Sequence, residues 1–125
     1  MRLPDLSDIP EMTFVDEGVT TRVEIVKAKD IKSTKTGREA IMLVCEFPDI
    51  DNANTMFHNM WMPMASDDAG KKATMLSMIK EFITAIGLDP EDSETEDFVG
   101  LSFDALIGQD EYQGQIKNII RKVIG

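Results

Sequence analysis

Two kinds of side chain in this sequence could together hold a ligand that is both charged and planar: cations and flat aromatic rings. The cations gather in residues 18–44, which hold six bases and three acids, and again near the C-terminus. Aromatic side chains are few, with one Trp, one Tyr and six Phe. Binding of a single nucleic-acid strand needs cations along a groove for the phosphates and rings on which the bases stack. Such a site therefore requires a fold that brings both kinds of side chain to one surface.

The candidate residues fall into these two groups. The candidate phosphate contacts are Arg22, Lys27, Lys35, Arg38, Lys117 and Arg121, with Lys29, Lys32 and Lys122 nearby in sequence. The candidate stacking residues are Phe57, Trp61 and Tyr112, whereas Phe47, Phe82, Phe98 and Phe103 are expected in the core. The alternative for the cations is a solvated face that keeps the protein in solution. The alternative for Phe57 and Trp61 is a place in the core, whereas Tyr112 lies in a turn, where core packing is harder to explain.

The order of hydrophobic patterns predicts the fold. Alternating apolar stretches cover about 20–29, 39–47, 55–64, 100–108 and 115–124, and a helical apolar period covers about 70–87. The order β-β-β-α-β-β predicts a mainly β protein, namely a five-stranded OB-fold-like barrel with one α-helix between strands 3 and 4. Strands 1 and 5 are expected to be neighbours across the closure of that barrel, which would join their cations into one patch.

Three local patterns set the expected faces of these elements. In the first strand, Val23 and Ile25 share one face and Val26 and Ala28 the other. In the third strand, one face carries Phe57, Asn59 and Trp61, and the opposite face carries Met56, His58, Met60 and Met62. The helix is expected to bury a stripe formed by Met75, Met78, Ile79, Phe82, Ile83 and Ile86. Its start is expected to be capped by Ser66, Asp67 or Asp68, and its end is expected at Gly87.

This succession resembles the OB-fold single-stranded DNA-binding proteins of tailed phages and a related family of uncharacterised phage proteins. The segments that carry the resemblance are Lys32 to Val44, Ala85-Ile86-Gly87-Leu88, Asp97-Phe98-Val99-Gly100 and Glu111-Tyr112-Gln113-Gly114. The resemblance implies sequence-independent binding of single-stranded DNA in phage replication or recombination. It also implies replication or recombination proteins as further partners.

Composition predicts one domain with an acidic extension. The 125 residues carry a net charge of −10, and residues 89–100 hold six acids and no base. Residues 1–17 are expected to form an acidic N-terminal arm and residues 18–125 the OB-fold-like domain. No apolar stretch approaches the roughly 20 residues of a membrane span, and the N-terminus lacks the apolar run of a signal peptide. We therefore expect a cytoplasmic protein without a membrane partner.

The sequence offers little for catalysis. One Cys and one His leave no metal-ligand spacing, and neither a nucleophile elbow nor a phosphate-binding loop is present. The expectation is a binding protein that is not an enzyme and has no metal or other cofactor. Two other functions stay open. One is an acidic protein-interaction module, either a DNA mimic or an inhibitor of a DNA-processing protein. The other is a structural subunit whose Met-rich third strand forms a homo-oligomer interface.

Overall fold

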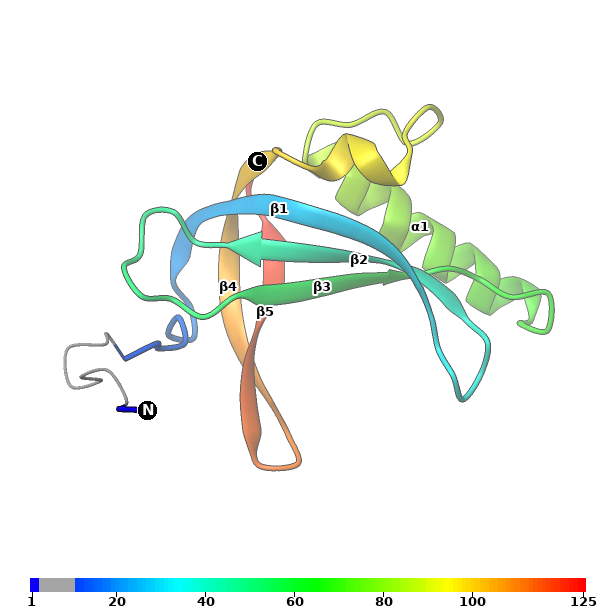
Figure 1. Cartoon of the computed structure of the whole chain (residues 1–125). Helices are drawn as coiled ribbons and strands as arrows, with labels where there is room; N and C mark the ends of the chain where they lie inside the picture. Colours follow the sequence, from blue (N-terminus) through cyan, green and yellow to red (C-terminus); the bar gives the residue numbers. More distant parts are fainter. Residues whose placement is uncertain (3–10) are drawn as a thin grey trace.

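Figure 1 shows the computed structural model of the chain, which describes residues 1–2 and 11–125. Its strands are β1 (Thr20–Lys32), β2 (Glu39–Glu46), β3 (Met56–Trp61), β4 (Ser102–Tyr112) and β5 (Gln115–Val123). One α-helix, α1 (Ala69–Ala85), and a short 3-10 helix, η1 (Thr95–Phe98), separate β3 from β4. The predicted order of elements is confirmed.

The five strands form one open antiparallel sheet in the order β3-β2-β1-β4-β5. The expected barrel is not closed within the described residues, because β3 and β5 approach each other without pairing. The expectation that the first and last strands are neighbours is wrong, because β4 lies between β1 and β5. The cations of β1 and β5 therefore do not form one continuous patch through adjacent strands.

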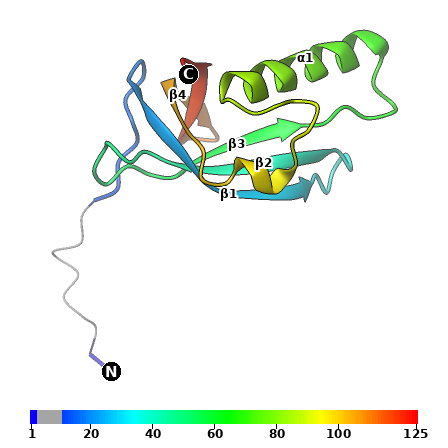
Figure 2. The same ribbon diagram turned by 90° about the horizontal axis from the view of Figure 1, so that it is seen from above.

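The core lies between one face of the sheet and the two helices (Figure 2). Its fully buried large side chains come from β1, β2, β3, η1 and β4, among them Ile25, Leu43, Met56, Phe98 and Ile107. The remaining Phe residues expected in the core, Phe47, Phe82 and Phe103, all belong to this cluster or pack against it. The core prediction for these rings is therefore confirmed.

The helix α1 packs mainly through its C-terminal half. Asp68 caps its start by accepting a hydrogen bond of 2.7 Å from the Lys71 backbone N–H, and Gly87 follows its end with a positive φ of 93°. Ile83 and Ile86 are buried, but Met78, expected in the buried stripe, is 66% exposed. Met78 borders an open groove between α1, β3 and β5 and therefore does not pack against the sheet. The N-terminal turns of α1 also extend beyond the end of β3 (Figure 2).

The strand β4 is longer than predicted and forms a protruding hairpin with β5 (Figure 1). The two residues at its tip, Gln113 and Gly114, both have positive φ, at 52° and 78°. A two-residue turn of this kind matches the twist of the flanking strands, so pairing continues up to Tyr112 and Gln115. The turn expected between the alternating stretches 100–108 and 115–124 is therefore confined to the tip.

The end of the predicted N-terminal arm packs against the sheet. Val15 is buried, and Thr13 forms an isolated bridge with Ala53. Asn118 on β5 is 3% exposed and holds Val15 at both backbone groups: it accepts from the N–H at 2.9 Å and donates to the C=O at 2.8 Å. The arm residues Leu3, Leu6 and Ile9 lie outside the described residues.

Replacing Asn118 with Ala should lower the free energy of unfolding by about 1–3 kcal/mol, because the buried N–H of Val15 loses its acceptor. Gln109→Ala is the comparison, because its amide donates a single bond of 2.9 Å to the Val15 C=O and should matter less. Chemical denaturation of both variants measures the effect. A change below about 0.5 kcal/mol for Asn118→Ala, typical of a surface site, would contradict this anchoring role.

Candidate nucleic-acid interface

The outer face of β1, β2 and β3 carries cations and aromatic rings in register. Residues paired directly across an antiparallel sheet point to the same face, so the strand pairing defines rows of side chains. Three rows lie on this face: Lys27–Val44–Phe57, Lys29–Met42–Asn59 and Ile31–Ala40–Trp61. The lysines and aromatic rings are exposed, Ile31, Met42 and Val44 are half-buried, and Ala40 is buried. We call these nine residues the platform. It has lysines along one side, apolar side chains in the middle and aromatic rings on the far side.

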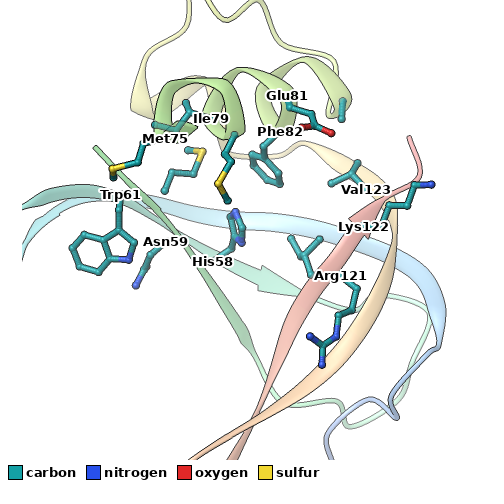
Figure 3. A pocket seen from close by; sticks show the side chains of 14 residues that line it. His58, Asn59, Trp61, Met75, Ile79, Glu81, Phe82, Arg121, Lys122 and Val123 are labelled. Atoms are coloured by element: carbon teal, nitrogen blue, oxygen red, sulfur yellow. The ribbon is translucent and has the colours of Figure 1, made fainter. Parts of the chain in front are cut away.

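The aromatic rings of the platform face solvent. Phe57 is 57% exposed and Trp61 is 37% exposed, while Met56 and Met60 of the same strand are buried on the opposite face. Figure 3 shows Trp61 and Asn59 pointing away from α1, whereas His58 points toward it. The predicted division of β3 into two faces is confirmed, and the core alternative for Phe57 and Trp61 is excluded by their exposure.

A bulge in β1 places the lysines on this face. The pairing with β2 shifts by one residue between Ile25 and Lys27. Without that extra residue, the alternation of the strand would turn Lys27 and Lys29 inward. The bulge also corrects the predicted faces of β1, because Ala28 now packs on the core side together with Val23 and Ile25.

The two platform lysines are exposed and form no ion pair with the described residues. Their partners on β2 are the apolar residues Val44 and Met42. Two strand spacings, about 10 Å, separate their backbone from that of the aromatic residues on β3. Lys35, in the loop that follows β1, is exposed as well and extends the cationic side. Lys32 is also exposed, but it follows Ile31 directly and therefore lies on the opposite face of the strand. Lys32 pairs with Glu39 in the ladder, so its surroundings are less cationic.

Arg38 has a different task from the one expected. Its guanidinium donates two hydrogen bonds of 2.8 Å to the carboxylate of Asp67 and one of 2.9 Å to the Met62 C=O. Both side chains are largely covered, with 16% and 5% exposed. This bidentate pair joins the start of β2 to the loop before α1, and it leaves Arg38 little capacity for a phosphate.

The remaining predicted cations lie away from the platform or have acidic neighbours. Arg22 pairs with Asp104 on β4, and Lys117 pairs with Asp110 within the β4–β5 hairpin. Arg121 bonds to the carboxylate of Glu17 at 2.8 Å, which lowers the pKa of Glu17 and raises that of Arg121. Arg121 lies over Gly108, where an added Cβ would collide with its side chain. Arg22 therefore shares β1 with the platform lysines but has an acidic partner, whereas Lys117 and Arg121 lie on β5.

Tyr112 is 68% exposed at the tip of the β4–β5 hairpin, as its position in a predicted turn suggested. That hairpin and the β1–β2 loop both project from the sheet on the side opposite α1 (Figure 1). The platform lies on the same side, since its rings point away from α1 (Figure 3). Tyr112 is therefore exposed on a projection from the side of the sheet that carries the platform.

The chain's only histidine and only cysteine are both withdrawn from solvent. His58 stacks on Phe82 with 4.6 Å between ring centroids, and burial lowers its pKa. Burial raises the pKa of Cys45 to about 12, which keeps its thiol protonated and unreactive at neutral pH.

Across residues 11–125, no group of three or more His, Cys, Asp or Glu side chains is placed to hold a metal ion. In the same part of the chain, no helix is long and apolar enough to cross a membrane.

Comparison with known proteins adds no relative: no family model matches the chain, and no curated protein is significantly similar to it. The case for a function therefore rests on the residues of this chain. Sequence reasoning identified both rings of the platform and Lys27, but it did not single out Asn59, Met42 or Val44. The alternation of residues 55–62 places Asn59 with the rings, whereas the pairing of strands could be read only from the structure.

Arg38→Ala should destabilise the fold at neutral pH, and the loss should shrink in acid. The Arg38 guanidinium, followed by the Met64 N–H, holds the pKa of Asp67 well below its ordinary value of 3.8. A carboxyl group whose pKa is lower in the folded state stabilises the fold above its ordinary pKa, and this contribution falls as the pH drops toward the folded value. Urea denaturation of both proteins at neutral pH and at about pH 3 measures the difference.

Lys71→Ala is the matched control, because Lys71 approaches the same carboxylate only at 3.5 Å and its side chain is 55% exposed. It should change the midpoint of unfolding little at either pH. An equal loss of stability for Arg38→Ala at both pH values would show that the pair contributes packing alone.

Proposed function

We propose that this chain binds single-stranded DNA without sequence preference, in phage replication or recombination, and that the platform is its binding surface. The observation that carries the proposal is the register of unpaired lysines and exposed aromatic rings across three adjacent strands. A solvated face that only maintained solubility would have no need of two exposed rings beside its lysines. The proposal also explains why β3 places Phe57 and Trp61 outward while its methionines pack inward.

Each part of the platform has a distinct role in this mechanism. Bases stack on Phe57 and Trp61, and each such contact is worth about 1–3 kcal/mol. Lys27 and Lys29 hold phosphates on the opposite side of the platform, and Lys35 in the β1–β2 loop extends that contact. Val44 and Met42 supply the apolar surface between them. Tyr112 adds a third ring from the β4–β5 hairpin.

The order of strands supports an OB-fold-like interpretation of the open sheet. In that fold, ligands bind on the face of strands 2 and 3 and on the loops that join strands 1 to 2 and 4 to 5. Here the exposed rings lie on β3, the apolar middle lies on β2, and both corresponding loops project on the side away from α1 (Figure 1). The surface selected by its residue types is therefore the surface that the topology favours.

The stacking requirement explains the preference for a single strand. The faces of the bases are available to Phe57 and Trp61 only when the bases are unstacked from each other. The lysines alone would attract duplex DNA as well, but with low affinity in a protein of net charge −10. The chain should therefore bind single strands in preference to duplex DNA of equal length.

Phe57→Ala and Trp61→Ala should each weaken binding of a thymine oligonucleotide of about 30 nucleotides by roughly 5- to 100-fold, because each variant removes a stacking partner. Fluorescence anisotropy measures the affinity with duplex DNA as competitor. Phe14→Ala is the control, since Phe14 is also an exposed ring but lies outside the platform. No binding by the unaltered protein even at low salt would overturn the proposal, and the acidic protein-interaction module would then be the function to test.

Lys27→Gln combined with Lys29→Gln should reduce the salt dependence of binding as well as the affinity. Each phosphate contact contributes about 0.7 to the slope of log affinity against log salt for single strands, so the double variant should lose about 1.4. The matched control is Lys71→Gln combined with Lys80→Gln, two exposed lysines on α1. Equal loss of slope in both double variants would mean that the cations act through net charge and not through position.

A further inference from the structure

A second surface lies on the other side of β3. The edge strands β3 and β5 diverge beneath α1, and the space between the three elements is a groove of about 510 Å³ (Figure 3). Its lining is mostly apolar and includes Met60, Met75, Ile79, Phe82 and Ile120. This volume falls within the usual range of ligand sites. The groove lies on the side of the sheet that faces α1, with Asn59 and Trp61 at its rim.

The backbone beside this groove has hydrogen-bonding groups that pair with no strand of residues 11–125. The Met62 N–H donates to the Glu39 C=O at 2.8 Å, which fixes the alternation along β3. The amides of His58 and Met60 therefore face β2, and those of Asn59 and Trp61 face the free edge. No strand in the described part of the chain pairs with that edge.

The strand β3 also lacks the features that normally prevent pairing at an edge. Charged side chains and prolines protect most natural edge strands. The six residues of β3 contain neither, whereas β5, the other edge, carries Lys117, Arg121 and Lys122. An unprotected edge next to an apolar groove is the combination used by proteins that recognise an extended peptide as an added strand.

The helix contributes an adaptable wall to the groove. Met75 and Met78 line it, and Met78 is 66% exposed although the helix period predicted its burial. Flexible methionine side chains adapt to different apolar partners. The ring of His58 also lines the groove, and its nitrogens make no hydrogen bond to any described residue.

We propose that this groove binds an extended apolar segment of a partner protein, added as a strand along the free edge of β3. Such a segment would satisfy the edge amides of Asn59 and Trp61 and place an aliphatic or aromatic side chain against Phe82 and His58. A second copy of this chain fits less well. In a second copy, each edge strand is paired with an inner strand of its own sheet. If such an edge strand were added to β3, the inner strand next to it would also have to fit between β3 and β5.

The probe is a displayed library of random twelve-residue peptides, selected against the full-length chain. Selected peptides should show alternating apolar residues and should bind the isolated protein in solution. Met78→Glu should lower the affinity for the selected peptides at least tenfold, because it places a charge in the groove. Leu76→Glu is the matched control: Leu76 is 53% exposed on the same helix but does not line the groove. Met78→Glu should leave affinity for the thymine oligonucleotide unchanged, which separates this site from the platform.

Hydrogen exchange distinguishes strand addition from other ways of filling the groove. A bound peptide should slow exchange of the Asn59 and Trp61 amides, which face the free edge, more than that of the His58 and Met60 amides, which are already paired. Protection confined to α1, or peptides that bind Met78→Glu as well as the unaltered chain, would overturn the proposal. So would a failure to select any peptide, or a dimer in sedimentation that Met78→Glu converts to monomer.

Discussion

The structure depends on the central position of β1 and on the one-residue shift within it. This strand pairs with β2 along its C-terminal part and with β4 along its N-terminal part, so both halves of the sheet are joined through it. Before the bulge, Val23 and Ile25 enter the core; after it, Ala28 does, and the lysines on either side face outward. The same irregularity therefore completes the core and creates the cationic side of the platform.

The arginines and the lysines of this protein have different roles. Arg38 and Arg121 both bond to carboxylates, Asp67 and Glu17, and both join segments that are far apart in sequence. The planar guanidinium, with its fixed set of donors, suits such bonds. The platform cations are lysines, whose compact charge on a long flexible stem tolerates a mobile ligand backbone. The net charge of −10 does not reveal these separate roles of arginine and lysine, because most of the acids that produce it lie in loops and the N-terminal segment.

Local patterns in the sequence were sufficient to predict the order of the secondary-structure elements and the residues that share the outer face of β3. The alternation of Phe57, Asn59 and Trp61 predicted that they share one face of the strand, but whether that face is exposed was left open; Gly87 marked the end of α1. Features that depend on distant partners were not predictable. The bidentate pair of Arg38 and Asp67 spans 29 positions. The bulge in β1 was not recognised, because Val23 and Ile25 followed by Val26 and Ala28 also fit a regular strand that is apolar on both faces in its middle. The open edge was missed for the same reason, since closure of a sheet is a global property.

The pairing of β1 with both a near and a distant strand has a consequence for how the chain folds. Strands β1 to β3 form an antiparallel meander from residues 20–61, and β4 with β5 forms a hairpin; both are local and can form early. Joining them requires Thr20 to meet Leu106, which closes a long loop and should set the folding rate. Every residue of the platform belongs to the first of these units. During synthesis, all nine platform residues are therefore made before β4 and β5, and only Tyr112, the third ring that we assign to DNA, follows on β4.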